Sequence, residues 1–392
     1  MGLIGGSTLA ACDDFLARGN TAGLDAQQFF LNLTNLNDVH LALLRGDQGV
    51  LQGLPVFSNR LRVVGEISRG GMGVVYQAWD VHIQRMVAVK EMLTSHHSSH
   101  KAFLRFQAEA RSMAAIRHPA VVSVYSVGTS QRGTPYLVME FVAGATLSDV
   151  VKLVARGHSV EEVLKPGNRV SAGLAASPTQ LDIQQVAAWG CSLAAGLQAC
   201  HDQGVIHRDV KPSNVLIDQD GCAKLTDFGV ALDPKGHHER LTAPGGAVGT
   251  PLYMAPENLL GSREFENVGP SADVYSLGAT LFTALTGSPP FVAASQQELF
   301  VKVYSGDVSP LSDFRDDVPA GLQAVLAKCL LRDPAQRYQT AAEVREALGQ
   351  YATGGHAQSM PAGLGRNPKL FLLLVVLLLL GVLSALAWLG GS

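Results

Sequence analysis

A glycine-rich run near the start of the chain could bring backbone amides close to a phosphate group. Residues 68–75 read Ser-Arg-Gly-Gly-Met-Gly-Val-Val and lie between two strand-like segments. Because glycine has no side chain, amides in such a turn can approach the phosphates of a nucleotide. The positions expected at the nucleotide are Ser68, Gly70, Gly71 and Gly73. Alone, a run of this kind is a weak signal.

A lysine that ends a strand-like run supplies the positive charge that phosphates need. Residues 87–90 read Val-Ala-Val-Lys, and the amine of Lys90 can bridge the α- and β-phosphates of a nucleotide. Glu109 stands on the helical stretch that follows, where its carboxylate could pair with Lys90. An isolated lysine and glutamate would usually be a surface ion pair, so this assignment depends on the other groups found in the same order.

Two carboxylates and an amide follow at a spacing that suits phosphoryl transfer. Residues 207–214 read His-Arg-Asp-Val-Lys-Pro-Ser-Asn, in which Asp209 can accept the hydrogen bond of a substrate hydroxyl and Asn214 can hold a magnesium ion. Further on, Asp227 begins the triplet Asp-Phe-Gly and offers a carboxylate to a divalent metal that bridges phosphates. The groups together predict a site for phosphoryl transfer from a nucleotide.

These motifs, in this order, resemble those of eukaryotic-type protein kinases, and residues 70–76 resemble the bacterial serine/threonine branch in particular. The resemblance covers residues 61–351 and implies ATP and Mg²⁺ as cofactors, with transfer of the γ-phosphoryl group to serine or threonine hydroxyls of protein substrates. It also implies autophosphorylation, for which the chain could self-associate. The implied roles are phosphate binding by Lys90, orientation of Lys90 by Glu109, the catalytic base at Asp209, approach of Lys211 to the transferred phosphate, and metal binding by Asn214 and Asp227.

The same resemblance implies an adenine pocket between the last strand of the small lobe and the large lobe. Met139 would lie at the back of the pocket, and the backbone of Glu140 and Val142 would hydrogen-bond adenine. The residues expected to sandwich the ring are Val75, Ala88 and Leu216. Three further positions match structural residues of the family, namely the ion pair of Glu257 with Arg337 and the aspartate that supports the catalytic loop, Asp273.

Features of the resemblance also bear on specificity and regulation. Lys211 and Thr250 follow the pattern of serine/threonine kinases rather than tyrosine kinases. Arg208 places a cation where a phosphate on the activation segment could dock, and Thr242 is the expected acceptor of that phosphate.

One position departs from the family pattern, because Ser68 stands where the first glycine of the phosphate loop is usual. We expect weaker nucleotide binding at most. The alternative function is that of a pseudokinase, a membrane-anchored scaffold without catalysis. Pseudokinases usually lose Lys90, Asp209 or Asp227, and all three are present here.

The elements that position these residues predict an α+β protein with two lobes. Alternating apolar and polar residues over 61–90 predict antiparallel strands, and the apolar spacing over 101–117 predicts a helix lying on them. From residue 181 onward the pattern is mainly helical, with strand-like pieces at 215–217 and 223–225. Between the lobes, residues 157–178 are rich in Gly, Ser, Ala and Pro and predict an inserted loop.

The two ends of the chain differ from the predicted kinase domain, for which we expect residues 59–351. Residues 1–58 form an extension in which 26–44 has helical apolar spacing; this helix either packs on the small lobe or serves as a regulatory or partner-binding helix. Residues 352–369 predict a flexible linker, and 370–389, an uncharged run, predict a transmembrane helix with residues 390–392 as a short tail. A buried core helix is the competing interpretation of that run.

The distribution of charge predicts how the chain is oriented in the membrane, and the net charge argues against nucleic acid as a partner. Arg366 and Lys369 precede the apolar run, so the large N-terminal part should face the cytoplasm, with the bacterial inner membrane as the expected location. A net charge of −3 offers no basic field for nucleic acid. The five scattered cysteines and the loop histidines favour neither disulfides nor a metal site; those histidines are His96, His97, His100, His237 and His238.

Overall fold

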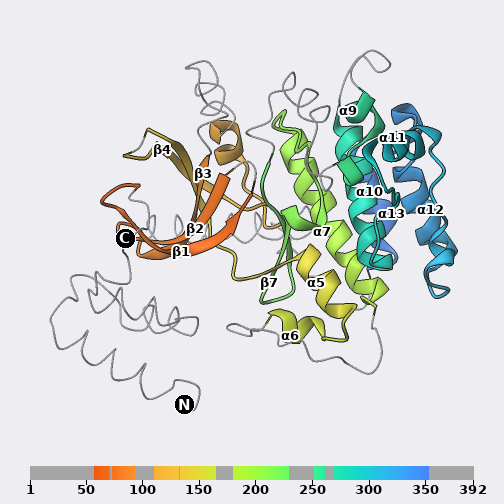
Figure 1. The fold of residues 1–392 in the computed structure, drawn as a ribbon, viewed down its shortest axis with the longest axis horizontal. Helices are drawn as coiled ribbons and strands as arrows, with labels where there is room; N and C mark the ends of the chain where they lie inside the picture. Colours follow the sequence, from red (N-terminus) through yellow and green to blue (C-terminus); the bar gives the residue numbers. More distant parts are fainter. Residues whose placement is uncertain are drawn as a thin grey trace, which may run out of the picture. The chain divides into compact units, whose positions relative to one another are not determined.

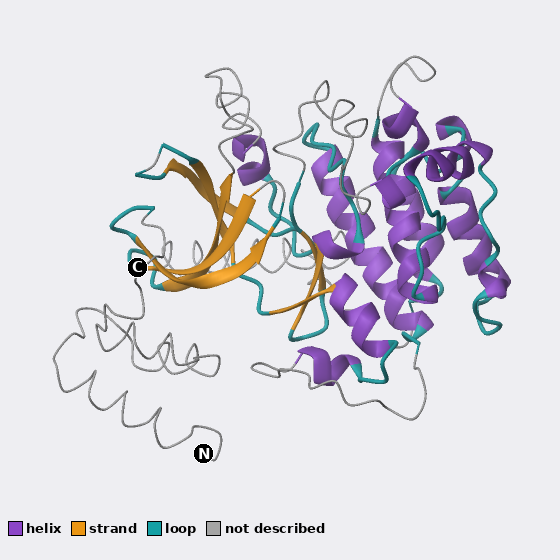
Figure 2. Ribbon diagram, in the orientation of Figure 1, coloured by secondary structure: helices purple, strands orange, loops and turns teal. Residues whose placement is uncertain are grey.

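The computed structural model describes residues 57–70, 73–92, 110–131, 133–164, 180–228, 251–260 and 269–352. The chain divides into two compact units at residue 353, and all described residues belong to the first unit. Within it, a β-sheet forms one lobe and a group of helices forms the other, as Figures 1 and 2 show.

The small lobe contains a five-stranded sheet in the order β1-β2-β3-β5-β4, and every neighbouring pair is antiparallel. Its strands are β1 (Leu61–Arg69), β2 (Gly73–Asp80), β3 (Arg85–Met92), β4 (Val124–Thr129) and β5 (Pro135–Glu140). The register of β1 against β2 shifts twice, between Val63 and Gly65 and between Glu66 and Ser68. The antiparallel strands predicted over 61–90 are therefore present, and residues 110–115 of the predicted helix are helical.

The large lobe is mainly helical, with a small sheet at its boundary with the small lobe. That sheet has the order β6-β7-β8, from β6 (Gly144–Thr146), β7 (Val215–Asp218) and β8 (Ala223–Leu225). The helices are α5 (Leu147–Val154), α6 (Val160–Leu164), α7 (Ile183–His201), α9 (Pro256–Leu260), α10 (Pro270–Thr286), α11 (Gln296–Ser305), α12 (Ala320–Cys329) and α13 (Ala341–Gly349). Short 3-10 turns are η4 (Pro212–Asn214), η5 (Pro251–Tyr253), η6 (Leu311–Asp313) and η7 (Pro334–Gln336).

Helix α10 runs through the middle of the large lobe, and its sequence explains both its ends and its burial. It begins with Pro270, whose missing N–H costs nothing at a helix start, and stops at Gly287, which adopts the left-handed conformation at φ 76°. All residues from Ala272 to Leu285 are buried. A helix that is buried on every side needs other elements around it, and α10 packs against α7, α12 and α13.

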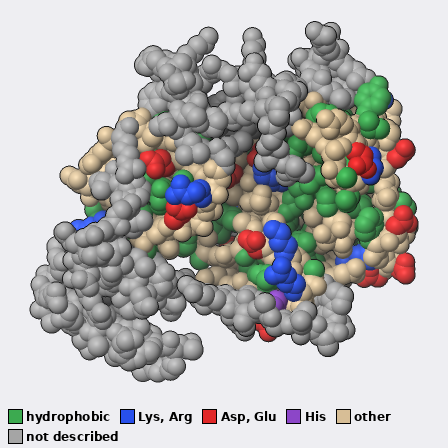
Figure 3. Space-filling model, in the orientation of Figure 1, with side chains coloured by type: hydrophobic (Ala, Val, Ile, Leu, Met, Phe, Trp, Pro, Cys, Tyr) green, Lys and Arg blue, Asp and Glu red, His purple; other side chains and the backbone are tan. Residues whose placement is uncertain are grey.

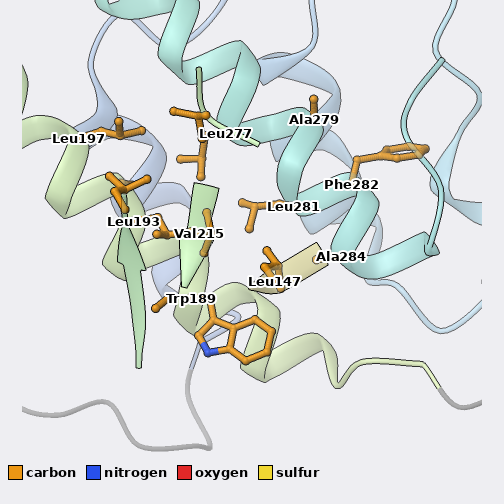
Figure 4. Close-up of a cluster of buried hydrophobic side chains, with 14 of the residues drawn as sticks. Leu147, Trp189, Leu193, Leu197, Val215, Leu277, Ala279, Leu281, Phe282 and Ala284 are labelled. Carbon is orange, nitrogen blue, oxygen red and sulfur yellow. The ribbon is translucent and has the colours of Figure 1, made fainter. Parts of the chain in front are cut away.

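The main apolar core joins α7, α10 and the small sheet. Figure 4 shows Trp189, Leu193 and Leu197 of α7 close to Val215 of β7 and Leu277 of α10. The helices pack tightly, since a methyl group added at the α7 residue Gly190 would lie 2.8 Å from Leu348 Cδ1 and 2.9 Å from Leu281 Cδ1. The large lobe is therefore closely packed around α7 and α10, and it holds the loop between α7 and β7 in place.

One predicted loop is partly wrong. The segment 157–178 contains helix α6, in which Val163 and Leu164 are buried. The Ser159 amide donates to Glu162 Oε2 at 3.0 Å, and the Glu162 amide donates to Ser159 Oγ at 3.2 Å. This reciprocal cap starts a helix within a stretch whose composition suggests a loop.

Several predicted features lie outside the described residues. They are Gly71, Glu109, Thr242, Thr250, most of the inserted loop, the two histidine groups, nearly all of the N-terminal extension and the segments 353–369, 370–389 and 390–392. Among the residues that the structure describes, no helix is both long enough and apolar enough to cross a bilayer. The transmembrane helix thus stays a prediction from the sequence.

Candidate active site

The centre of the site is the carboxylate of Asp209, in the loop between α7 and β7. Lys211 Nζ lies 2.9 Å from Asp209 Oδ1 and 2.8 Å from Oδ2. Asn214 Nδ2 donates to the backbone oxygen of Asp209 and to its Oδ2, each at 2.8 Å. The η4 turn places Lys211 and Asn214 on the same side as the carboxylate. The structure therefore brings together three of the residues selected from the sequence and holds Asp209 in one orientation.

A buried aspartate on α10 fixes the beginning of this loop. Asp273 is fully buried and accepts hydrogen bonds from the His207 and Arg208 amides, both at 2.8 Å. Its Oδ2 also lies 2.7 Å from His201 Nε2 at the end of α7. Arg208 adopts the left-handed backbone conformation at φ 64°, which is unfavourable for a residue with a side chain. The bonds to Asp273 offset that cost and turn the chain toward Asp209.

The ring of His207 links the catalytic loop to the Asp-Phe-Gly segment. Its Nε2 lies 3.0 Å from the Thr226 oxygen, and its Nδ1 accepts from the Asp209 amide at 3.3 Å. The ring also packs on Phe228, with centroids 4.3 Å apart. Complete burial lowers the pKa of His207, so the neutral ring donates from Nε2 and accepts at Nδ1.

Asp227 faces the small lobe. Its Oδ1 lies 2.8 Å from Lys90 Nζ, so the lysine of β3 and the aspartate after β8 form an ion pair between the lobes. Asp227 adopts the left-handed conformation at φ 57°, which is uncommon for a residue with a side chain. Glu109, the partner expected for Lys90, lies outside the described residues, so the pairing of these two side chains stays a prediction.

The glycine-rich turn connects β1 and β2. Ser68 pairs with Val75 across the two strands, and the Gly70 amide donates to the Gly73 oxygen at 2.9 Å. A methyl group at Gly73 would collide with the backbone oxygen of Glu91 on β3. Gly73 is thus required for the close approach of β3, whatever its role at a phosphate.

The expected adenine pocket is lined by residues that share the main apolar core. Ala88 and Met139 pair across β3 and β5 and are both buried. The remaining members that pack against this core are Val75, Val142 and Leu216. The region thus offers an apolar surface at the edge between the lobes.

Glu140, the last residue of β5, uses its amide and its carboxylate in hydrogen bonds. Its amide donates to the Ser123 oxygen at 2.9 Å, and its carboxylate accepts from the Ser123 amide at 3.2 Å and from Lys224 Nζ at 2.8 Å. The pairing with Lys224 was not predicted, because an acidic residue and a lysine 84 positions apart give no local sequence signal.

The oxygen atoms near the site fit a magnesium ion that also binds phosphates. Asn214 uses its amide nitrogen on Asp209, which leaves its side-chain oxygen as a ligand, and Asp227 supplies a carboxylate. Mg²⁺ usually takes one or two protein oxygens and completes its shell with water and phosphate oxygens. Within the described ranges no cluster of three or more His, Cys, Asp or Glu could hold a metal alone.

The ion pair expected from the family pattern supports the large lobe. Arg337 Nη1 lies 2.7 Å from Glu257 Oε1, and Nη2 lies 2.9 Å from Oε2, with both side chains buried. This bidentate ion pair joins α9 to the segment before α13. Sequence reasoning did not assign a role to His201 or to the ring of His207, although His207 lies within the quoted motif.

Comparison with known proteins agrees with the geometry. Residues 61–348 match the family model described as protein kinase domain. Serine/threonine-protein kinase PknB of Mycobacterium leprae (strain TN) is 35% identical over 303 residues, which cover 76% of this chain and 44% of PknB. Serine/threonine-protein kinase PknL of Mycobacterium tuberculosis (strain H37Rv) is 33% identical over 290 residues, 73% of this chain and 64% of PknL. This chain therefore matches less than two thirds of the length of either relative.

A solved structure shows the same architecture. The crystal structure of the Mycobacterium tuberculosis PknI kinase domain superimposes with a TM-score of 0.56 and 25% sequence identity, over 76% of this chain and 98% of that one. The two-lobed fold expected from the sequence is therefore confirmed for the part of the chain that was described. Because the family model matches residues 61–348, more than half of the chain, this chain belongs to the protein kinase family.

Proposed function

We propose that the chain is an active serine/threonine protein kinase, which transfers the γ-phosphoryl group of ATP to hydroxyls of protein substrates. The observation that carries this proposal is the carboxylate of Asp209, held by Lys211 and Asn214 at 2.8–2.9 Å. Lys90 and Asp227 complete the set of charged groups, 2.8 Å from each other. A scaffold without catalysis would have no need for all of them.

The residues of the chain would divide the work of the reaction. Asp209 accepts the proton of the attacking hydroxyl and orients its oxygen, while Lys211, beside it, offsets negative charge on the transferred group. Lys90 binds the phosphates of the nucleotide. Asn214 and Asp227 would hold Mg²⁺, which when bound neutralises phosphate charge. Since phosphoryl transfer demands little covalent chemistry from the protein, positioning and charge supply most of the rate.

The choice of serine and threonine as acceptors rests on Lys211 and on the relatives. Lys211 lies two positions after the proposed base and contacts it directly. The relatives PknB and PknL are both named serine/threonine-protein kinases. The decisive experiment incubates the full-length protein with Mg²⁺ and labelled ATP and identifies the modified amino acids by acid hydrolysis. Phosphoserine and phosphothreonine are expected; phosphotyrosine alone, or no label, would contradict the proposal.

Regulation by autophosphorylation forms part of the same proposal. Arg208 follows the bend of the catalytic loop, and within the described part of the structure its buried Nε has no hydrogen-bond partner. A phosphate on the segment after Asp227 would supply strong acceptor oxygens for this guanidinium. Two copies of the chain that meet at a membrane could modify each other in this way.

We further propose a membrane tether, with the kinase domain in the cytoplasm and a bacterial inner membrane as the location. The support is the sequence of residues 370–389, an uncharged run preceded by Arg366 and Lys369. Twenty helical residues at 1.5 Å each would cross about 30 Å of hydrocarbon. The tether is tested below together with its effect on autophosphorylation.

A further inference from the structure

One buried histidine near the catalytic loop has no part in the proposed division of work. His201 is the last residue of α7, and its side chain is 4% exposed. In the view of Figure 3, little histidine is visible on the described surface, in keeping with this burial. The ring nitrogen Nε2 lies 2.7 Å from Asp273 Oδ2, whereas Nδ1 has no hydrogen-bond partner within the described residues. Because an unpaired buried nitrogen costs free energy, the contact at Nε2 has to offset the burial of the ring.

The contact with Asp273 determines which nitrogen of the His201 ring carries the proton. An ionised carboxylate can only accept hydrogen bonds. The two oxygens of Asp273 already accept from the amides of His207 and Arg208. His201 must therefore donate from Nε2, and in the neutral ring Nδ1 is then unprotonated. This arrangement leaves no buried N–H of the ring without an acceptor, which is the costlier of the two possible omissions.

Asp273 holds its negative charge where water does not reach it. Its side chain is 0% exposed, and burial together with the charge of Asp273 raises the pKa of the Cys200 thiol to about 12. A buried carboxylate is stable only when hydrogen bonds replace its lost hydration. Two of its donors are amides of the catalytic loop, and the third is His201 at the end of a packed helix. His201 therefore anchors the carboxylate from outside the loop that the carboxylate holds.

The loop needs a fixed carboxylate because Arg208 has an unfavourable backbone conformation. Its φ of 64° lies in the left-handed region, and such a conformation persists only where the surroundings impose it. The Arg208 amide donates to Asp273 Oδ1 at 2.8 Å. Rotation of an aspartate carboxylate about its last side-chain bond is a soft motion, and the bond from His201 to Oδ2 opposes it. Asp209, the next residue in the chain, therefore starts from a fixed position.

We propose that His201 is a positioning residue for phosphoryl transfer, which acts through Asp273 and fixes the start of the catalytic loop. This inference rests on the proposed kinase function. The effective group is the N–H at Nε2 rather than the bulk of the ring. The backbone of the same turn has its own support, because the Val205 amide donates to the Cys200 oxygen at 3.0 Å. Removing the N–H should therefore loosen the start of the loop while α7 stays folded.

The first test compares two substitutions in the full-length protein by steady-state kinetics with a peptide substrate. The amide nitrogen of glutamine can replace Nε2, so His201→Gln should keep kcat within about threefold of the original value. His201→Leu removes the donor and should lower kcat about 10- to 100-fold, with the Michaelis constant for ATP unchanged because Lys90 and Asp227 are untouched. His158→Leu is the matched control, since His158 contacts Glu162 at 4.0 Å on the surface and should leave kcat unchanged. Equal kcat values in the glutamine and leucine variants would overturn the proposal.

A second test does not depend on activity. Hydrogen exchange of the full-length protein, resolved to single amides by mass spectrometry, should be about tenfold or more faster at His207 and Arg208 in His201→Leu than in His201→Gln. The amide of Leu281, in the middle of α10, should exchange equally in both and reports that the large lobe stays folded. If Leu281 loses protection, His201→Asn replaces the leucine variant, because its side chain is too short to reach the position of Nε2.

The two tests separate this inference from the proposed function. Unchanged exchange at His207 and Arg208 without the donor would contradict the positioning role, even in an active kinase. Faster exchange in a protein that never transfers phosphate would contradict the kinase function and support the hold of His201 on the loop.

Discussion

Asp209 is held by partners that lie within five residues of it in the chain, so its geometry is local. The carboxylate has contacts to Lys211 and Asn214 and is only partly exposed. Substituting asparagine would keep the size of the side chain and remove the carboxylate oxygen that we propose as the acceptor of the substrate proton. Local packing would change little, because the surrounding loop is held separately by Asp273.

We expect Asp209→Asn to lower kcat by about 100- to 10,000-fold, the usual contribution of a general base. The unfolding free energy should remain close to that of the original protein. The measurement is ATP turnover on a protein substrate beside urea unfolding. Asp316→Asn, an exposed carboxylate in the large lobe, is the matched control and should leave kcat unchanged. Near-normal turnover in Asp209→Asn would show that another group acts as the base.

Ser68 is a second residue whose effect can be isolated. It is exposed at the end of β1, opposite Val75. Replacing it with glycine removes a side chain at the turn without breaking a packed contact. The Michaelis constant for ATP should therefore fall or stay the same in Ser68→Gly. A clear rise, measured in steady-state kinetics, would mean that the serine hydroxyl contributes to nucleotide binding.

The neutral ring of His207 connects the catalytic loop to Thr226, the residue that follows β8. Burial lowers the pKa of His207 below its ordinary value of about 6.5. In the unfolded chain the same ring takes up a proton as the pH falls below that value, whereas the folded ring does not. The stability that this histidine contributes is therefore complete above pH 6.5 and is lost as the pH falls toward the lowered, folded value.

Urea unfolding between pH 7 and pH 5 checks this expectation. Stability should decline with acidity, and His207→Gln should remove up to about 1.4 kcal/mol per pH unit of that decline, which is the contribution of one proton. The comparison between the two proteins isolates the contribution of His207 to this decline. Parallel curves for the two proteins would show that His207 is not held neutral.

The packing between helices gives a second prediction at this scale. A methyl group at Gly278 of α10 would lie 2.6 Å from Cys329 Cβ of α12, whereas one at Gly349, at the end of α13, would meet no atom within 4 Å. Gly278→Ala should destabilise the protein by about 1–3 kcal/mol through crowding. Gly349→Ala should stabilise it by about 0.5–1 kcal/mol, because alanine favours the helix. Urea midpoints measure both, and equal signs would contradict the packing described.

Features of the fold and the site could be predicted from the sequence where the interacting residues lie close together in the chain. The strands of the small lobe follow from alternation, and Asp209, Lys211 and Asn214 share one short motif, so pattern and spacing predicted them. The helix α6 was missed because its signal is one short cap within a loop-like composition. The contacts of Asp273 with His201 and of Glu140 with Lys224 join residues 72 and 84 positions apart, a separation that only the fold can close.

At the scale of the whole molecule, the consequence of the proposed tether is an increase in local concentration. Two kinase domains confined to a membrane surface meet more often than the same domains in dilute solution. The domain itself should not need the tether for chemistry, because all residues proposed for the site lie between Ser68 and Asp227, far from residues 370–389 in the sequence.

A chain ended after Ala352 should therefore phosphorylate a peptide at the rate of the full-length protein but autophosphorylate more slowly at equal, low concentration. The full-length protein in lipid vesicles is the reference, and it should sediment with the vesicles while the shortened chain stays in the supernatant. Sedimentation of both proteins would remove the tether from residues 353–392. Equal autophosphorylation rates would remove the proximity effect and leave the segment as an anchor only.

The buried carboxylate of Asp273 has a consequence for the entropy of the catalytic loop. It accepts hydrogen bonds from two successive amides at the start of the catalytic loop and also contacts His201 at the end of α7. Fixing the backbone of a residue costs about 1–2 kcal/mol of conformational entropy. For His207 and Arg208 that loss occurs once, during folding, and is not repeated at each turnover. The loop that carries the proposed base is therefore already ordered before a substrate binds.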